Sequence, residues 1–217
     1  MSAFLAPIHY WLYNKIMLVN ERTVQILNSL SPNDSEIALI VSEMATQSIG
    51  ASLLDKELAD IIDHDNIHAW LQKKINLVET REAFIINEIV VMLGADVIST
   101  IKSVFQKSGQ HYGNIASSQN TNLLTPHSVY KLVNDYFLNG MPCDQCDKIV
   151  TQTPTTITWE NQRWLQEINW QRANADVKLL ADLYLIWMQS FIQNLDNRFY
   201  LEYKHNGDKN SFTLFMH

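Results

Sequence analysis

The sequence predicts an α+β protein that is predominantly α-helical: a multi-helix bundle with a small C-terminal antiparallel sheet of about three strands. Apolar residues recur three or four positions apart over much of residues 1–140, as on one face of a helix. The period changes to two, as in a half-buried strand, over residues 147–159 and 198–216. Since 217 residues suit one domain with a large core, we expect a single domain over residues 1–217.

Helices are predicted over residues 2–30, 32–49 and 66–93, with a shorter segment over residues 53–62. Ser2 can cap the first helix, and Ser31 followed by Pro32 is the cap-plus-proline pattern that starts a helix. Gly50 ends the second helix. Each of these signals places a helix boundary without reference to tertiary structure.

Two further helices complete the helical body, residues 1–140. One covers residues 97–118, and the polar residues after it are typical of an exposed loop. The other starts at Thr125 and Pro126, which repeat the cap-plus-proline signal. Gly140 then supplies the left-handed stop that helix ends prefer.

The segment from Gly140 to Trp159 is the hinge of the chain, because the helical pattern ends there. We expect a hinge strand over 147–159, a helix over 161–170, a central helix over 173–195 and a hairpin over 198–216. The helix over 173–195 is apolar on more than one face, so it is expected at the centre.

The composition of the chain argues against some classes of binding partner. The chain is 47% hydrophobic and 18% charged, and its 16 basic and 23 acidic residues give a net charge of -7. No cluster of basic residues offsets this charge, so nucleic acid is not an expected partner. No apolar run reaches the roughly 18–20 residues that span a membrane. Two cysteines are no disulfide scaffold, so a cytoplasmic location is expected.

Glu82 is a candidate functional residue in the helix over residues 66–93. On a helical wheel it lies about 40° from the centre of the apolar face. A carboxylate there is costly unless it is paired or binds a metal, so Glu82 is a candidate metal ligand or general base, with Glu79 one turn earlier. The alternative is that Glu82 lies at the edge of the apolar stripe and reaches water or the neighbours of Arg81.

Two histidines have unusual surroundings. Small residues on both sides of His111, including Gly109 and Gly113, leave room beside the helix for a ligand or for another backbone. The alternative is a surface histidine at a helix end. His9 lies in an aromatic segment, where it either contacts a ligand or bonds to a backbone carbonyl in the core.

Two short motifs suggest thiol or metal chemistry. Cys143 and Cys146 are separated by two residues, but they follow a helix C-terminus, where the helix dipole does not acidify a thiol. Cys143 can still be a nucleophile or metal ligand beside a histidine; otherwise both are reduced structural thiols. His64 and His68 have the spacing of two zinc ligands on one helical face, or belong to a capping segment.

Two stretches carry a family resemblance. FLAPIHYWLYNKI at residues 4–16 and GMPCD at residues 140–144 resemble a family of uncharacterised bacterial helical proteins. From Ser108 onward the order of elements is similar to that of L-2-amino-thiazoline-4-carboxylate hydrolase-like proteins, down to a terminal hairpin over residues 207–212. Ser211 stands where that family carries a cysteine.

Three functions are consistent with these residues. The first is a small-molecule enzyme, a hydrolase or related lyase, with a divalent metal as a possible cofactor. In this enzyme Cys143 is the nucleophile or a metal ligand, and His9 and His111 are the acid and the base. Glu82 orients one of these groups or coordinates the metal. The second is a non-catalytic module that binds or senses a small ligand. The third is an interaction protein that forms a homo-oligomer, which the low charged fraction suggests.

Overall fold

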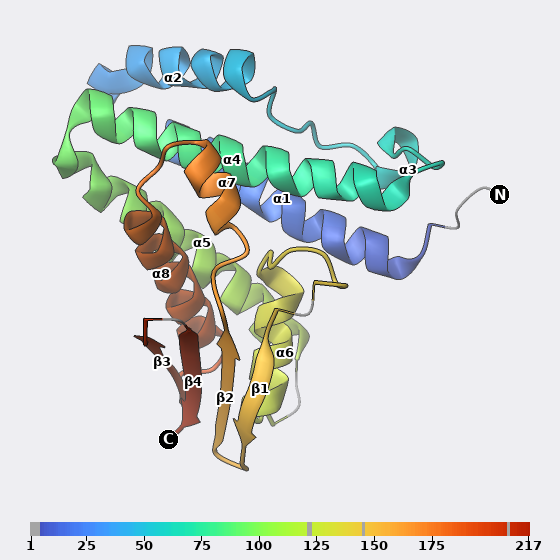
Figure 1. Cartoon of the computed structure of the whole chain (residues 1–217). Helices are drawn as coiled ribbons and strands as arrows, with labels where there is room; N and C mark the ends of the chain where they lie inside the picture. Colours follow the sequence, from blue (N-terminus) through green and yellow to red (C-terminus); the bar gives the residue numbers. More distant parts are fainter. Residues whose placement is uncertain (1–4, 121–122, 145, 208) are drawn as a thin grey trace. The chain divides into compact units, whose positions relative to one another are not determined.

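The computed structural model describes residues 5–120, 123–144, 146–207 and 209–217, and it confirms a predominantly helical α+β fold with an antiparallel sheet (Figure 1). The chain divides into two compact units. The first unit consists of Met1–Ile101 and Ile168–Val177, and the second of Lys102–Glu167 and Lys178–His217. The first unit therefore takes a short segment from the second half of the chain.

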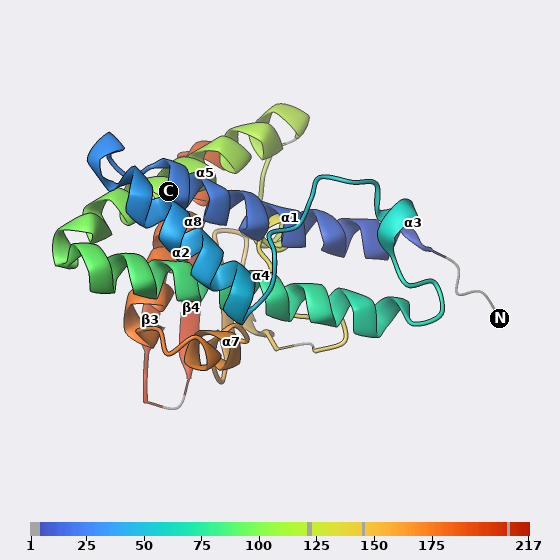
Figure 2. The same cartoon turned by 90° about the horizontal axis from the view of Figure 1, so that it is seen from above.

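Helices build the first unit. Its elements are α1 (Pro7–Asn28), η1 (Pro32–Asp34), α2 (Ser35–Ser48), α3 (Leu58–Ile61), α4 (Ile67–Leu93), η2 (Ala95–Val97) and most of α7 (Glu167–Arg172). Helices α1 and α4 lie side by side, and α2 packs on α4 (Figure 2). The core includes Ile16 and Ile26 of α1 and Leu71, Val78 and Ile85 of α4, all of which are buried as the helical spacing predicts.

The predicted helix boundaries in this unit are close to the observed ones. Pro32 starts a 3-10 turn that leads into α2, and α4 begins directly after Asn66. The predicted cap Ser2 lies outside the described residues; α1 begins at Pro7, with Ala6 as its N-cap. Pro7 is tolerated there because the first turn of a helix leaves its backbone N–H groups unbonded.

The second unit combines helices with a sheet. It contains α5 (Ile98–Gln119, except its first turn), α6 (Pro126–Tyr136), α8 (Val177–Leu195) and strands β1 (Lys148–Gln152), β2 (Thr156–Asn161), β3 (Phe199–His205) and β4 (Asn210–Met216). All pairings are antiparallel, in the order β1-β2-β4-β3. Helix α6 packs on β2 and β4, and Thr125 forms its predicted cap by accepting a hydrogen bond from the Ser128 backbone N–H.

The sheet has four strands rather than about three. The single hinge strand predicted over 147–159 is a hairpin, β1 followed by β2, whose turn contains Pro154 and is closed by a hydrogen bond from Thr153 N to Thr156 O at 2.8 Å. Proline cannot donate to a strand ladder, so the alternating pattern on its two sides belongs to two strands.

Two helices after the hinge begin later than the sequence suggests. In place of the helix predicted over 161–170, β2 extends to Asn161 and α7 starts at Glu167. The helix predicted over 173–195 starts at Val177. Asn174 explains the second difference, since its φ of 51° is left-handed and interrupts the helical backbone between α7 and α8.

Within the described ranges, no helix combines the length and the apolar character that crossing a bilayer requires.

Candidate ligand-binding site

The four residues proposed as a catalytic set lie in different surroundings. His9 and Glu82 belong to the first unit, and His111 and Cys143 to the second. Within the first unit, Glu82 is ion-paired with Arg22, which follows His9 by thirteen positions on α1. Thirteen residues of α-helix span roughly 20 Å, so His9 and Glu82 do not form one catalytic centre.

Glu82 is neutralised by an arginine. Its side chain is 1% exposed, and its two carboxylate oxygens accept hydrogen bonds from Arg22 Nε and Nη2 at 2.8 and 2.9 Å. It therefore neither reaches water nor lies open to a metal ion. Arg22 was missed in the sequence, although it stands three residues after Val19 and four before Ile26, which places it on the buried face of α1.

Glu79 is the second buried carboxyl group of this helix. It accepts a hydrogen bond from Asn169 Nδ2 at 2.6 Å. Burial, together with the nearby charge of Glu82, raises the pKa of Glu79 to about 8, against the opposing effect of the Asn169 bond. Glu79 is therefore a protonated acid at neutral pH. The two carboxyl groups and Arg22 form a buried cluster with no net charge.

The room beside His111 is filled by another backbone. Ideal Cβ atoms on Gly109 and Gly113 would lie 2.4 Å from the carbonyl oxygens of Trp187 and Phe191, so α8 crosses α5 at these two glycines. His111 itself is exposed. The backbone-packing interpretation of the small residues thus holds, and the ligand interpretation does not.

The two cysteines differ in environment. Cys143 is exposed, whereas Cys146 is half-buried, with Asn139 Nδ2 at 3.0 Å and Asp147 Oδ1 at 3.4 Å from its sulfur. Burial and the adjacent Asp147 carboxylate raise the pKa of Cys146 to about 12. Cys146 is therefore a protonated thiol at neutral pH, which suits a structural role better than a nucleophilic one.

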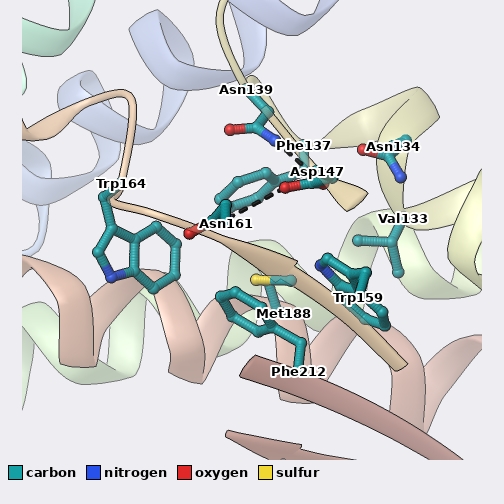
Figure 3. A pocket seen from close by; sticks show the side chains of 10 residues that line it. All are labelled: Val133, Asn134, Phe137, Asn139, Asp147, Trp159, Asn161, Trp164, Met188 and Phe212. Atoms are coloured by element: carbon teal, nitrogen blue, oxygen red, sulfur yellow. Dashed lines mark hydrogen bonds between the residues drawn. The ribbon is translucent and has the colours of Figure 1, made fainter. Parts of the chain in front are cut away.

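Asp147 lies at a small cavity of the second unit (Figure 3). Asn139 and Asn161 donate to its carboxylate at 3.3 and 3.0 Å, and Trp159 and Trp164 are among the aromatic side chains around it. The cavity volume is about 10 Å³, which suits no more than about one water molecule. This is a polar junction between the hinge loop and the sheet rather than a ligand pocket.

A larger hollow adjoins this junction. It has a volume of about 510 Å³, and its walls include Cys146, Lys148, Arg163, Lys209 and Glu160. Its three cationic side chains are exposed, and Lys209 is already 3.3 Å from Glu160. Exposed, solvated charges give a ligand little binding energy, so this hollow is a weaker candidate than a buried charge would be.

The strongest candidate is a groove of the first unit with a volume of about 550 Å³. Its apolar lining comes from Val24, Leu27, Leu30, Pro32, Ala38 and Leu39. Its polar lining is mostly hydroxyl groups, from Thr23, Ser31, Ser35, Ser42 and Ser52, with Asn28. Among the described residues that line it, Arg81 alone carries a charge.

Arg81 is buried without a carboxylate partner among the described residues. It is 4% exposed, and its one short hydrogen bond runs from Nη1 to Gly50 O at 2.7 Å. Thr46 Oγ1 and Ser42 O follow at 3.3 and 3.4 Å, and Nε is buried with no hydrogen-bond partner in the part of the chain that the structure describes. Burial lowers the pKa of Arg81. The groove thus contains a cation whose donors are incompletely satisfied.

The buried position of Arg81 has a signal in the sequence. Arg81 and Glu82 lie three and four residues after Val78, and Ile85 lies four and three residues after them, so both charges face inward on α4.

The structure brings together a histidine pair other than the predicted one. His64 precedes α4, and its Nε2 is 3.1 Å from Ala59 O, so it does not share a helical face with His68. His68 instead faces His9, with 3.4 Å between their Nε2 atoms. Burial and the neighbouring His68 lower the pKa of His9. The described residues contain no group of three or more His, Cys, Asp or Glu side chains placed to hold a metal ion.

The chain matches no protein-family model, and no curated protein or solved structure is significantly similar to it. The resemblance of residues 4–16, 140–144 and the second half of the chain to known families therefore stays a prediction.

Proposed function

We propose that the protein is a small-molecule-binding module whose ligand is an organic anion with an apolar body, held in the groove beside Arg81. The observation that carries this proposal is the buried guanidinium of Arg81, which lines a groove of about 550 Å³ and whose Nε has no hydrogen-bond partner among the described residues. Ligand pockets commonly measure 300–1,000 Å³ and combine an apolar lining with a few polar anchors.

The charge of Arg81 determines the head of the ligand. A buried charge costs free energy unless it is paired, and within the described residues the donors of Arg81 meet neutral oxygens alone. A carboxylate would supply both the missing negative charge and acceptors for a planar guanidinium. The hydroxyl group of Ser42 can donate to the same head.

The leucine and valine side chains determine the rest of the ligand. Leu39 is 73% exposed and Val24 is 39% exposed, so the groove keeps apolar surface in contact with water. An apolar ligand that covers this surface gains about 25 cal/mol for each Å² removed from water. The proposed ligand is therefore amphipathic, with an acidic head and a hydrocarbon body.

Ligand binding is better supported than the predicted cysteine hydrolase. The predicted nucleophile, Cys143, is exposed to solvent rather than enclosed among apolar side chains. The carboxylate of Glu82, the proposed orienting group, is already paired with Arg22.

The proposal is tested by titrating the purified protein with decanoate and with decanol, which share a hydrocarbon chain and differ in charge, using isothermal titration calorimetry. We expect decanoate to bind at least about tenfold more tightly, because one charge-assisted hydrogen bond contributes about 1.5–3 kcal/mol. Arg81→Gln should remove this preference, and Arg81→Lys should retain part of it.

Leu39→Asp gives a second test that leaves the core intact. It places a negative charge at the mouth of the groove and should weaken decanoate binding with little change in stability. The matched control is Leu123→Asp, which changes an equally exposed leucine of the second unit and should not affect binding. Equal affinities for decanoate and decanol, or unchanged decanoate binding in Arg81→Gln, would contradict the proposal.

A further inference from the structure

The N-terminal ends of α1 and α4 bring two imidazoles together. His9 lies in the first turn of α1 and His68 in the first turn of α4. Their Nε2 atoms are 3.4 Å apart, and their ring centroids are 5.5 Å apart with an angle of 56° between the planes. His68 is exposed and His9 is partly exposed, so this pair is accessible from solvent.

We propose that His9 and His68 form a two-histidine binding site for a late first-row divalent cation such as Zn²⁺. Imidazole nitrogen is a preferred ligand of Zn²⁺, Cu²⁺ and Ni²⁺. Two nitrogens that bind a tetrahedral zinc ion at about 2.0–2.1 Å lie about 3.3–3.4 Å from each other. The observed Nε2 separation equals this tetrahedral edge, so the cation requires only a small adjustment of the side chains.

The helices hold the two histidines in place. Helices α1 and α4 pack along each other, and farther along the same pair Arg22 and Glu82 form a buried ion pair thirteen and fourteen residues after His9 and His68. The two contacts have nearly the same spacing on both helices, which therefore run in the same direction. A metal bound at one end would join helices already aligned by the ion pair, so little ordering is needed on binding.

A metal ion that binds this pair must replace the proton that the two rings share. The backbone N–H of Ala6 donates to Nδ1 of His9 at 2.9 Å, so the neutral His9 ring carries its proton on Nε2 and donates it to His68 Nε2. A cation bound to both Nε2 atoms replaces this shared proton, which moves to Nδ1 of His9. Ala6 N–H then loses its acceptor, and binding at this site competes with the N-cap of α1.

The two histidines supply two of the four positions of a tetrahedral ion and leave the others to water. Structural zinc sites use four protein ligands and catalytic ones use three. The site proposed here is therefore an open, exchangeable one. It is independent of the groove beside Arg81 and needs no ligand there.

The test is titration with Zn²⁺, followed by calorimetry and by thermal unfolding, in a Cys143→Ser/Cys146→Ser background that removes the competing thiols. We expect one ion per chain and a rise in Tm with zinc concentration, because an ion that binds only the folded state stabilises it. His9→Gln and His68→Gln should each weaken binding at least about tenfold. His64→Gln is the matched control and should bind as the parent does. Mg²⁺, which prefers oxygen ligands, should not bind.

A second measurement uses the Cys143→Ser/Cys146→Ser protein with no histidine substitution, so a histidine variant that fails to fold does not affect it. Nitrogen-15 chemical shifts of the histidine rings should change on Zn²⁺ addition at Nε2 of His9 and His68 and stay constant at His64. The inference is overturned if Zn²⁺ does not bind, if either glutamine variant binds as tightly as its parent, or if other histidines show the shifts.

Discussion

Arg81 and Glu82 are neighbours on α4, and both are buried, yet only Glu82 has a charged partner among the described residues. The difference follows from where each side chain points. Glu82 meets Arg22 of α1, whereas Arg81 meets backbone and hydroxyl oxygens of α2 and the segment after it. One charge is paired with an opposite charge within the fold, and the other has no carboxylate partner among the described residues. This contrast places the proposed function at Arg81.

Glu79 gives a prediction at the scale of one residue. Its pKa is 4.5 when unperturbed and about 8 in the fold, so between these pH values the folded chain keeps a proton that the unfolded chain has released. Stability therefore falls as the pH rises from about 4.5 to about 8. One pKa unit corresponds to about 1.4 kcal/mol, so the fall should be on the order of several kcal/mol.

The measurement is the free energy of unfolding by urea at pH 5, 7 and 9. Glu79→Gln keeps an acceptor for Asn169 but cannot ionise, so its stability should depend much less on pH. Glu43→Gln, at an exposed position of α2, is the control and should keep the parental dependence. If the free energy of unfolding of Glu79→Gln depended on pH as strongly as that of the parent, Glu79 would have to be ionised in the fold.

At the scale of elements, the crossing of α5 and α8 depends on two glycines. Gly109→Ala and Gly113→Ala would each bring a methyl group within 2.4 Å of a backbone carbonyl of α8, which cannot move aside as a side chain can. Alanine favours a helix over glycine by about 1 kcal/mol, but the overlap should cost more. We expect each variant to lose a net 1–3 kcal/mol or more, roughly, in thermal unfolding.

The control for this prediction is Asn114→Ala, at an exposed position of the same helix. It should be neutral or slightly stabilising, because alanine is the better helix former. Stabilisation by alanine at Gly109 or Gly113 would mean that the helices do not approach as closely as described.

The elements themselves were largely predictable, because their signals are local. Thr125 and Pro126 fix the start of α6, and the alternation after Phe199 fixes β3. The alternation on both sides of Pro154 predicts one hinge strand, but proline cannot donate to a strand ladder, and β1 pairs with β2 across the turn that contains it. The break in the helix at Asn174 was not predictable either, because nothing in the sequence distinguishes an asparagine with a left-handed backbone from any other asparagine.

The groove beside Arg81 contains none of the residues predicted as a catalytic set, because a groove depends on which faces of the helices meet. The helical wheel placed Glu82 on the buried face correctly, but it could not say that Arg22 lies opposite. Similarly, His68 was paired with His64 by spacing, whereas its neighbour is His9 on another helix. Side-chain spacing describes one helix at a time, and partners on a second helix follow from packing.

At the scale of the whole molecule, the first unit depends on a segment far away in the sequence. Asn169 of α7 is 2% exposed and donates to Glu79, a residue 90 positions earlier. Arg172 in turn donates to Asn169 Oδ1 at 2.9 Å. The segment Ile168–Val177 is therefore fixed to α4 by a buried polar contact.

Asn169→Ala should lower the stability of α4 as well as that of α7. The change leaves Glu79 buried without its donor, and an unsatisfied buried polar group costs about 1–3 kcal/mol. Hydrogen exchange followed by mass spectrometry should show faster exchange in α4 peptides around Glu79, although the substitution lies in the second half of the chain. Asn114→Ala, the same replacement at an exposed position, should leave these peptides unchanged. Faster exchange confined to α7 would mean that this segment covers the first unit without supporting it.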